Sequence, residues 1–324
     1  QGFKVEQPQD KVVVTAGQMI NLTCTVSGDK SIIGPVRWLK GWGSGNETVY
    51  AGKGSFPRVT RAESESSTDF SISISNAQPG DSGTYYCVKF RRTVTDDGEV
   101  FQRGKGTEVS VHARPTHPVV SGPDQRGKPG QSVTFTCTAR GFFPKDIGVK
   151  WFKDKTETPA ERTDITPGRT NSSYSMSSTV KVTLQKDNVR SRLICAVQHT
   201  TLQEPLRAEY NLSHVLRVSP SVRVSSEPPA PVEVNKTVTI ICRVEGFYPG
   251  HLNVTWLENG TELKAVNTSQ PEELPSGFFE LKSLVEVRAT AEKSGAVITC
   301  RVVHDGQSPI DGQTTLQIIT PANE

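Results

Sequence analysis

The chain has 324 residues, with 37 lysines and arginines against 34 aspartates and glutamates, and its formal net charge is +3. A charge this close to zero gives no reason to expect a nucleic-acid or anionic-membrane partner. No apolar run approaches the roughly 20 residues of a membrane helix, and Gln1 is expected to be a mature N-terminus left after removal of a secretion signal.

The first region, residues 1–113, predicts β-strands. Ile20-Asn21-Leu22 has apolar side chains at every second position, and Phe70, Ile72 and Ile74 alternate with serines. Alternation with a period of two is typical of strands that bury one face. Val36–Lys40, between these runs, is expected to be a central strand.

A cysteine, a tryptophan and a second cysteine indicate the fold class of this region. Trp38 lies fourteen residues after Cys24, and Cys87 ends the run Asp-Ser-Gly-Thr-Tyr-Tyr-Cys that begins at Asp81. This spacing is typical of an immunoglobulin sandwich, in which a disulfide joins two sheets and the indole packs against it. The Tyr85 hydroxyl, two residues before the second cysteine, is expected to bond to backbone upstream.

The end of this region indicates a variable-set domain. Residues 101–111 resemble the joining segment of antibody and T-cell-receptor variable domains, and Gly104 and Gly106 would permit a bulge in that last strand. Arg58 resembles the variable-set arginine that pairs with an aspartate, here Asp81. A catalytic role for this aspartate is therefore less favoured than an ion pair.

Variable domains gather three loops at one end, and these loops are the predicted binding surface. Ile32 and Ile33, within the loop of residues 28–35, either fold back into the sandwich or form an apolar contact patch. The hairpin of residues 89–101 starts with basic residues and has acidic ones at its tip, which predicts charge-complementary recognition or an ordinary solvated hairpin. Trp42 either packs on the turn after the central strand or anchors a partner.

Two further regions, residues 114–218 and 219–324, repeat the cysteine–tryptophan–cysteine pattern. Each has a Gly-Phe-x-Pro run before its tryptophan and a Cys-x-Val-x-His run at its second cysteine. Both runs resemble constant-set immunoglobulin domains. His199 and His304 occupy matched places in the two domains, so we expect them to serve the fold rather than a metal.

Proline marks two predicted breaks in the strands. The junction at residues 113–115 contains Pro115, which fixes φ and predicts a stiff hinge. Residues 227–231 hold three prolines at the first strand of the last region, and proline is typical of an edge strand protected from pairing with another chain.

The chain is therefore predicted to be all-β, with a variable-set sandwich at 1–113 and two constant-set (C1-type) sandwiches at 114–218 and 219–324. Six cysteines allow many pairings, and the repeated tryptophan favours the sequential one. Disulfides of this kind imply an oxidising compartment. The predicted bridges are Cys24–Cys87, Cys137–Cys195 and Cys242–Cys300.

Eight N-x-S/T sequons support the same compartment. Asn21 and Asn253 lie beside residues that face the core, so their own side chains are expected to point outward. The predicted glycosylation sites are Asn21, Asn46, Asn171, Asn211, Asn235, Asn253, Asn259 and Asn267.

The sequence contains no recognisable enzyme motif. It has no Gly-x-Ser-x-Gly run, no phosphate-binding loop and no His-Glu-x-x-His run. We therefore expect a non-enzymatic protein with no cofactor, no metal and no small-molecule substrate.

The order of the three domains and four short runs resemble the signal-regulatory proteins, a family of paired leukocyte receptors. The resemblance covers the full length, and it implies the extracellular part of a single-pass plasma-membrane receptor. A secreted form is an alternative. The runs are Tyr-Tyr-Cys-Val-Lys-Phe-Arg at 85–91, Gly-Thr-Glu-Val-Ser-Val at 106–111, Val-Val-Ser-Gly-Pro at 119–123 and Thr-Trp-Leu-Glu-Asn-Gly at 255–260.

The resemblance also implies a partner. The inhibitory member of this family binds the integrin-associated protein through the loop tips of its first domain and restrains phagocytosis through tyrosine phosphatases. Phosphatases or adaptors would act only through regions absent from this sequence. The implied ligand contacts are Ile33, Gly34, Pro35, Arg37, Lys53, Lys89, Arg92, Asp96 and Glu99.

Several loops differ in length from those of that inhibitory member. The loop before Val36–Lys40 is one residue longer, and the 89–101 hairpin carries an extra residue near Gly98. An activating receptor, or a secreted or adhesion molecule that does not bind this ligand, is therefore the alternative.

Overall fold

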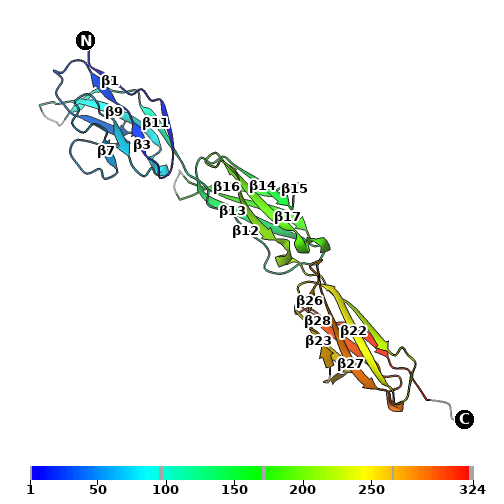
Figure 1. The fold of residues 1–324 in the computed structure, drawn as a ribbon. Coiled ribbons are helices and arrows are strands. Elements are labelled where there is room, and N and C mark those ends of the chain that lie inside the picture. Colours follow the sequence, from blue (N-terminus) through cyan, green and yellow to red (C-terminus); the bar gives the residue numbers. More distant parts are fainter. Residues whose placement is uncertain (1, 95–97, 170–172, 265, 321–324) are drawn as a thin grey trace.

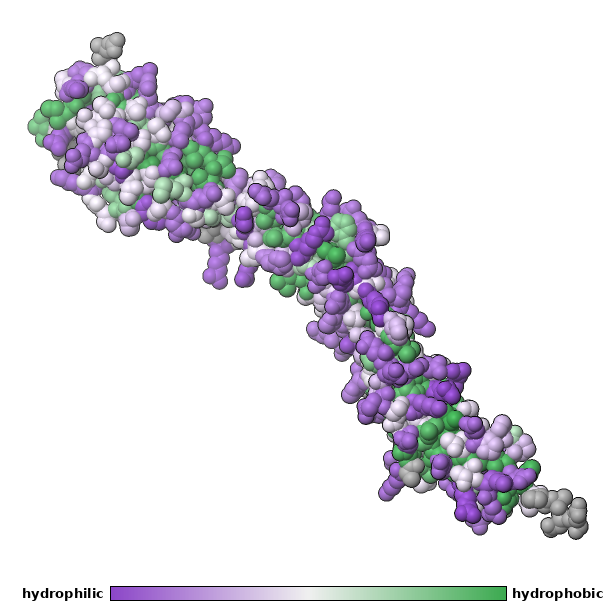
Figure 2. Space-filling model, in the orientation of Figure 1, coloured by the Kyte–Doolittle hydropathy of each residue, from purple (hydrophilic) through white to green (hydrophobic). Residues whose placement is uncertain are grey.

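The computed structural model describes residues 2–94, 98–169, 173–264 and 266–320. These residues form thirty β-strands and four 3₁₀ helices of three to five residues, which confirms the all-β prediction. Three sandwiches lie end to end as a rod, with β1 (Lys4–Glu6) in the first and β28 (Val297–His304) in the last (Figure 1). Polar residues cover most of the face in Figure 2, where apolar residues form separate patches.

Domain one contains a larger sheet, a smaller sheet and a short strand pair. The larger sheet has the order β2 (Lys11–Thr15), β11 (Thr107–His112), β9 (Gly83–Arg91), β5 (Val36–Lys40) and β6 (Glu47–Tyr50), with β10 (Glu99–Arg103) also paired to β9. The smaller sheet has the order β3 (Ile20–Leu22), β8 (Ile72–Ile74) and β7 (Val59–Arg61), β1 pairs with β4 (Thr25–Ser27), and η1 spans Pro79–Asp81.

The N-terminal segment of domain one changes sheets. β1 pairs with β4, whereas β2 pairs in parallel with β11. Gln7, between β1 and β2, is 3% exposed, and its Nε2 donates to the Tyr85 carbonyl. Its Oε1 accepts from the amides of Cys87 and Gly106. One buried side chain thus joins the crossover to the two strands beside it.

The last strand of domain one is interrupted at the two glycines that predicted a bulge. Arg103 pairs with Val88 and Thr107 pairs with Tyr85, so three residues on this strand face two on β9. Gly106 has a φ of +94°, a left-handed conformation that favours glycine. The predicted bulge is confirmed.

Domain two has two four-stranded sheets. The first has the order β12 (Val119–Ser121), β13 (Ser132–Phe142), β17 (Tyr174–Thr183) and β16 (Arg162–Pro167). The second has the order β15 (Thr156–Thr158), β14 (Ile147–Lys153), β18 (Arg192–His199) and β19 (Leu206–Asn211), and the helices are η2 (Lys186–Arg190) and η3 (Leu212–Val215).

Domain three repeats this arrangement. One sheet has the order β20 (Ser221–Glu227), β22 (Thr237–Phe247), β27 (Phe279–Arg288) and β25 (Val266–Thr268), and β26 (Glu272–Glu273) also pairs with β27. The other has the order β24 (Thr261–Leu263), β23 (Leu252–Glu258), β28 and β29 (Ile310–Thr315), and η4 spans Ala291–Lys293.

The proline-rich run of domain three follows its edge strand. β20 ends at Glu227 on the outer edge of one sheet. After residues 228–231 the chain forms β21 (Val232–Glu233), which pairs in parallel with β30 (Ile318–Ile319). The prediction of a bend at an edge strand is confirmed, and the bend also transfers the chain to a new partner strand.

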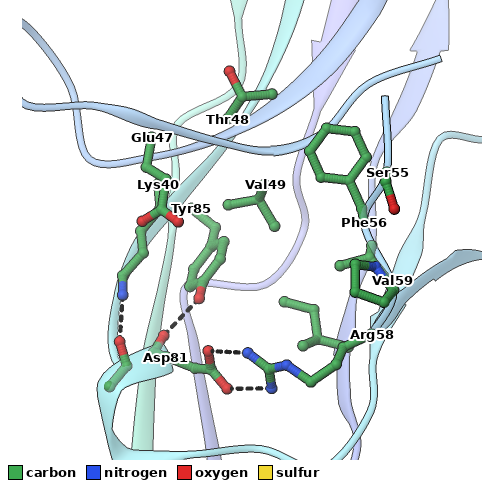
Figure 3. Close-up of a pocket in the computed structure, with 13 residues that line it drawn as sticks. Lys40, Glu47, Thr48, Val49, Ser55, Phe56, Arg58, Val59, Asp81 and Tyr85 are labelled. Atoms are coloured by element: carbon green, nitrogen blue, oxygen red, sulfur yellow. Dashed lines mark hydrogen bonds and ion pairs between the residues drawn. The ribbon is translucent and has the colours of Figure 1, made fainter. Parts of the chain in front are cut away.

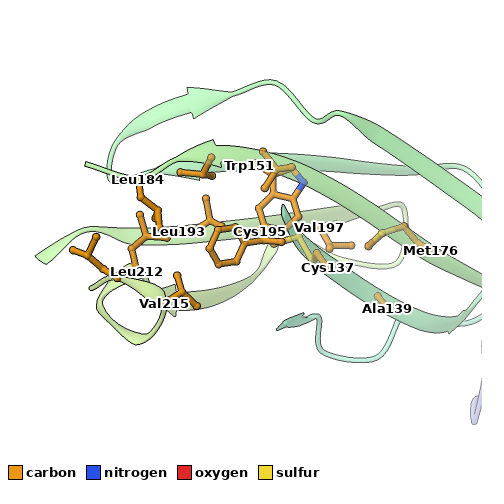
Figure 4. Close-up of a cluster of buried hydrophobic side chains, with 14 of the residues drawn as sticks. Cys137, Ala139, Trp151, Met176, Leu184, Leu193, Cys195, Val197, Leu212 and Val215 are labelled. Atoms are coloured by element: carbon orange, nitrogen blue, oxygen red, sulfur yellow. A yellow bond between two sulfur atoms is a disulfide. The ribbon is translucent and has the colours of Figure 1, made fainter. Parts of the chain in front are cut away.

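Each sandwich is closed by the predicted disulfide. The bonds are Cys24–Cys87, Cys137–Cys195 and Cys242–Cys300. The three following tryptophans are at most 1% exposed, and each lies opposite the second cysteine of its domain on the neighbouring strand. Figure 4 shows Trp151 beside the Cys137–Cys195 bond in the core of domain two.

Both joints between sandwiches use the same backbone pairing. Ala113 and Phe143 exchange two hydrogen bonds of 2.9 and 3.1 Å, and Val218 and Tyr248 exchange two of 2.8 and 3.0 Å. Phe143 and Tyr248 are the third residues of the two Gly-Phe-x-Pro runs. The bonds between Ala113 and Phe143 restrain the junction predicted at residues 113–115.

The matched histidines serve the fold, as predicted. His199 and His304 are 3% and 2% exposed, and each Nε2 donates to a proline carbonyl of the Gly-Phe-x-Pro run at 2.8 Å. Each ring also lies edge-on against the phenylalanine of that run. The histidine therefore holds the turn next to each joint.

Candidate ligand-binding surface

Three loops meet at the end of domain one that lies away from domain two. β11 runs to the joint, and β9 is antiparallel to it, so β9 ends at the far end. Because β5 is antiparallel to β9 and β6, the loop before β5 and the loop after β6 lie there as well. The structure thus brings together residues 28–35, 51–58 and 92–94.

A groove of about 730 Å³ lies between these loops. Four of the nine predicted ligand contacts line it, namely Pro35, Arg37, Lys53 and Arg92. Thr48 and Phe56 also line the groove and were not predicted. The alternation of Thr48 with core-facing Val49 was the signal that could have identified it.

The cations of the groove are not neutralised within the described part of the chain. Arg37, Lys53 and Arg92 form no ion pair among those residues. The Arg37 guanidinium instead lies 5.0 Å from the centre of the Phe90 ring, and Lys53 and Arg92 are exposed. Such a groove attracts negatively charged groups of a partner.

The loop before β5 presents one apolar side chain. Ile33 is 69% exposed, and the neighbouring Ile32 is less exposed and half-buried. Val94, from the loop after β9, is fully exposed. Of the two interpretations of the adjacent isoleucines, folding back into the sandwich does not describe Ile33.

Lys89 does not have the position expected of a ligand contact. Its side chain is 9% exposed, and its Nζ donates to the Gly34 carbonyl at 2.6 Å. Side chains alternate along β9, so Lys89 points to the interior like Cys87. A direct contact between this ammonium group and a ligand is at odds with such burial.

The stem of the 89–101 hairpin carries paired charges. Arg91 Nη2 lies 2.5 Å from Glu99 Oε1, and both side chains are about half exposed. The Arg91 guanidinium also lies 5.4 Å from the centre of the Phe101 ring. The predicted contact Glu99 is therefore engaged within the hairpin, and the predicted contact Asp96 lies outside the described residues.

Trp42 packs on the outer face of the larger sheet and keeps 44% of its surface exposed. Its ring lies 5.3 Å from that of Tyr86. The Arg103 guanidinium is 4.8 Å from the Trp42 ring and 4.7 Å from the Tyr86 ring. The structure therefore supports packing on the turn, while leaving part of the indole accessible.

Arg58 and Asp81 line a second cavity, of about 270 Å³ (Figure 3). Two hydrogen bonds of 2.9 and 2.8 Å join Arg58 to Asp81, and the Tyr85 hydroxyl donates to the Asp81 carbonyl at 2.6 Å. Burial opposes ionisation of Asp81, but hydrogen bonds from Arg58 and the Gln78 amide outweigh it and lower the pKa of the carboxyl. Burial raises the pKa of Tyr85. The predicted ion pair and tyrosine contact are confirmed.

Seven of the eight predicted sequon asparagines are described, and all seven are exposed. Ser73 donates to Asn21 Oδ1, and the Val297 amide donates to Asn259 Oδ1. These two bonds do not involve Nδ2, the atom to which a glycan attaches. Asn171 lies outside the described residues.

Three other features concern the cysteines, metal-binding side chains and membrane-spanning helices of the described ranges. All six cysteines are in disulfides. Those ranges contain no group of three or more histidine, cysteine, aspartate or glutamate side chains placed to hold a metal. They also contain no helix long and apolar enough to cross a membrane.

Comparisons with known families and structures agree with this architecture. The family described as "Immunoglobulin V-set domain" matches residues 7–112, and "Immunoglobulin C1-set domain" matches residues 119–202 and 222–307. The solved structure "Crystal Structure of Rst D1-D2" shares the fold, with a TM-score of 0.54 at 17% identity over 65% of this chain and 98% of that chain.

Curated relatives match almost the whole chain. "Tyrosine-protein phosphatase non-receptor type substrate 1" of Bos taurus is 43% identical over 99% of this chain and 64% of its own length. "Signal-regulatory protein beta-1" of Homo sapiens is 42% identical over 98% of this chain and 79% of its own length. "Cell adhesion molecule 3" of Xenopus laevis is 27% identical over 78% of this chain and 60% of its own. The chain thus spans less than two thirds of the bovine relative.

Proposed function

Because this chain belongs to the signal-regulatory protein family of the immunoglobulin superfamily, we propose that it is the extracellular part of a leukocyte cell-surface receptor. The observation that carries this proposal is the groove at the far end of domain one, where Arg37, Lys53 and Arg92 lack ion pairs in the described chain. An unpaired cationic groove at the tip of a rod suits an acidic protein surface on another cell. Domain boundaries after residues 113 and 218 belong to the same proposal.

The proposed ligand is the integrin-associated protein. Ile33 supplies an exposed apolar contact, and the cationic groove beside it supplies charge complementarity. Binding would regulate phagocytosis through parts of the receptor outside this sequence. The seven exposed sequon asparagines are proposed to carry glycans, which peptide mapping before and after glycosidase treatment would detect.

Surface plasmon resonance of the full chain against the immunoglobulin domain of the integrin-associated protein tests this proposal. Ile33→Asp and Lys53→Glu should each weaken binding more than about tenfold, because both change the presented surface. Ile165→Asp and Lys128→Glu, exposed residues of domain two, are the matched controls and should bind normally. Normal binding by both tip variants would exclude this surface as the ligand site.

A receptor of the activating type, or an adhesive or secreted molecule that does not bind this ligand, is the second candidate. The ion pair between Arg91 and Glu99 favours it, because that pair neutralises the charge of one predicted acidic contact. The complete transcript would separate the candidates. Tyrosine motifs after a membrane helix indicate inhibition, a lysine within that helix indicates activation, and the absence of both indicates adhesion or secretion.

A further inference from the structure

Lys89 is a buried cation at the end of domain one that lies away from domain two. It is 9% exposed, and it lies beneath the loop that presents Ile33. Its ammonium group is 5.5 Å from the centre of the Phe3 ring and 2.6 Å from the Gly34 carbonyl oxygen. Burial lowers the pKa of this ammonium group because it removes water from the charge. The hydrogen bond to the Gly34 carbonyl compensates for the lost water.

Three consecutive carbonyls of the loop accept hydrogen bonds from one segment, residues 89–92, at the end of β9 and just beyond it. The Arg92 amide donates to Ile33 at 3.0 Å, and the Phe90 amide donates to Pro35 at 2.9 Å. Carbonyls of an extended segment alternate in direction, so the backbone amides of residues 90 and 92 can reach the first and third of them only. Lys89 donates to the second one, Gly34, with its side chain.

The close approach of the loop to β9 depends on Gly34. A Cβ added at Gly34 would lie 2.0 Å from the Phe90 carbonyl oxygen, a distance that backbone cannot accommodate without a shift. Glycine thus lets the loop lie against the strand, and Lys89 then holds the glycine carbonyl. The exposure of Ile33 follows from this arrangement, because the backbone on both sides of Gly34 is tied down.

We propose that Lys89 is a positioning residue for the ligand site: it holds the loop of residues 33–35 from below and so sets how Ile33 is presented, without touching the ligand. The proposal rests on the proposed function for the identity of the site. It differs from that function in assigning Lys89 to the architecture of the site, whereas Lys53 belongs to its surface.

The test compares Lys89→Met, which keeps the length and apolar stem of the side chain, with Lys53→Met in the full chain. Hydrogen–deuterium exchange without ligand should be about tenfold faster at the Arg92 and Phe90 amides in Lys89→Met and unchanged in Lys53→Met. Surface plasmon resonance against the same immunoglobulin domain should show about tenfold weaker binding for both variants. Only Lys53→Met should reduce the dependence of affinity on salt concentration, because only that side chain faces the ligand.

The proposal would be overturned if the Arg92 and Phe90 amides of Lys89→Met exchanged at the wild-type rate and the affinity of this variant depended less on salt concentration. That result would mean that Lys89 contacts the ligand directly. If Lys89→Met fails to fold, Lys89→Arg keeps the question answerable. The Arg guanidinium can still donate to the Gly34 carbonyl. A positioning role therefore predicts that the Arg92 and Phe90 amides stay protected in Lys89→Arg and that its binding is stronger than that of Lys89→Met. Unprotected amides in a folded Lys89→Arg protein would contradict the proposal. If the wild-type chain does not bind this ligand, the proposed ligand is wrong, and the exchange measurement still decides the role of Lys89.

Discussion

Gln7 joins three segments of domain one through one amide side chain. It is 3% exposed, and its contacts with Tyr85, Cys87 and Gly106 span 78 to 99 residues of sequence. A Cβ at Gly104 would lie 2.3 Å from Gln7 Oε1, so that glycine makes room for the amide. At the scale of single residues, buried polar groups of this kind fix where the N-terminal segment crosses between sheets.

Replacing Gln7 with leucine should destabilise domain one. The change leaves the buried amides of Cys87 and Gly106 without the acceptor that they share, at a cost of about 3 kcal/mol. The transition of domain one in calorimetry of the full chain should fall by more than about 10 °C. Gln203→Leu, at an exposed position, is the control and should melt normally. An unchanged transition in Gln7→Leu would show that water replaces these bonds.

Asp81 should make domain one sensitive to acid. Its folded-state pKa is lowered by Arg58 and the Gln78 amide against the effect of burial. A carboxyl with a depressed folded pKa contributes stability that is present above its unfolded pKa of about 4 and lost as pH falls through the folded value. Denaturation between pH 2 and 7 should therefore show a loss of stability below about pH 4 that is smaller in Asp81→Asn.

Asp10→Asn provides the control for that experiment. The Asp10 side chain is 86% exposed in its ion pair with Lys105, and exposed pairs contribute little. Its pH profile should follow that of the wild type. Parallel profiles for wild type and Asp81→Asn would show that the Arg58 pair does not contribute to acid sensitivity.

At the scale of elements, the bulge in the last strand of domain one depends on Gly106. Its φ of +94° permits the bulge, and an added Cβ would lie 2.7 Å from the Tyr86 ring. That ring stacks with Arg103, which also lies over Trp42. The bulge therefore couples the backbone of the strand to the packing on the outer face of the sheet.

Gly106→Ala should disturb this region. The left-handed conformation and the contact with the Tyr86 ring together should cost about 2 kcal/mol of domain-one stability. Tryptophan fluorescence of the full chain should also change, because Trp42 packs against the same ring. Gly45→Ala, where an added Cβ meets no atom within 4 Å, should leave both measurements unchanged. Equal behaviour of the two variants would remove the special role of Gly106.

The constant-set domains share an indole contact that domain one lacks. Trp151 and Trp256 donate to the hydroxyls of Ser178 and Ser283, at 3.0 and 2.8 Å. In domain one, Trp38 donates to a backbone carbonyl, that of Phe70. The tryptophan spacing alone predicted burial correctly, but it carried no information on the partner of the indole nitrogen.

At the scale of the whole molecule, the joint between domains two and three is more than a linker. Tyr248 and Phe278 of domain three pack against the core of domain two. Arg217 and Asp305 form an ion pair of 2.9 Å, with side chains 13% and 24% exposed. These contacts fasten the two domains along the axis of the rod (Figure 1).

Arg217→Ala should loosen this joint. It leaves the Asp305 carboxylate partly buried without its cation, which should weaken the contact by about 2 kcal/mol. Distances between spin labels on domains two and three should then spread over a wider range. Arg223→Ala removes an exposed ion pair with Glu245 and should keep the narrow distribution. A distribution in Arg217→Ala as narrow as that of the wild type would show that the backbone pairing alone holds the joint.

The sequence by itself determined the three sandwiches, their disulfides and their buried tryptophans. Strand alternation is a local property, and a tryptophan follows the first cysteine by the same interval in all three domains, as Trp38 follows Cys24. The Arg58–Asp81 pair was also predictable, because both residues stand in a recognisable pattern.

Only the tertiary structure decided which predicted contacts form a surface. Lys89 and Arg92 are three residues apart, yet the former is buried and the latter exposed. The alternation of β9 turns Lys89 inward, but the partner of its ammonium group, the Gly34 carbonyl, comes from a loop 55 residues earlier in the sequence. The partners of Gln7 and the pairing at the two joints are likewise set by segments distant in the chain. Sequence patterns report the face of a strand, whereas hydrogen-bond partners across loops and domains depend on how separate segments meet.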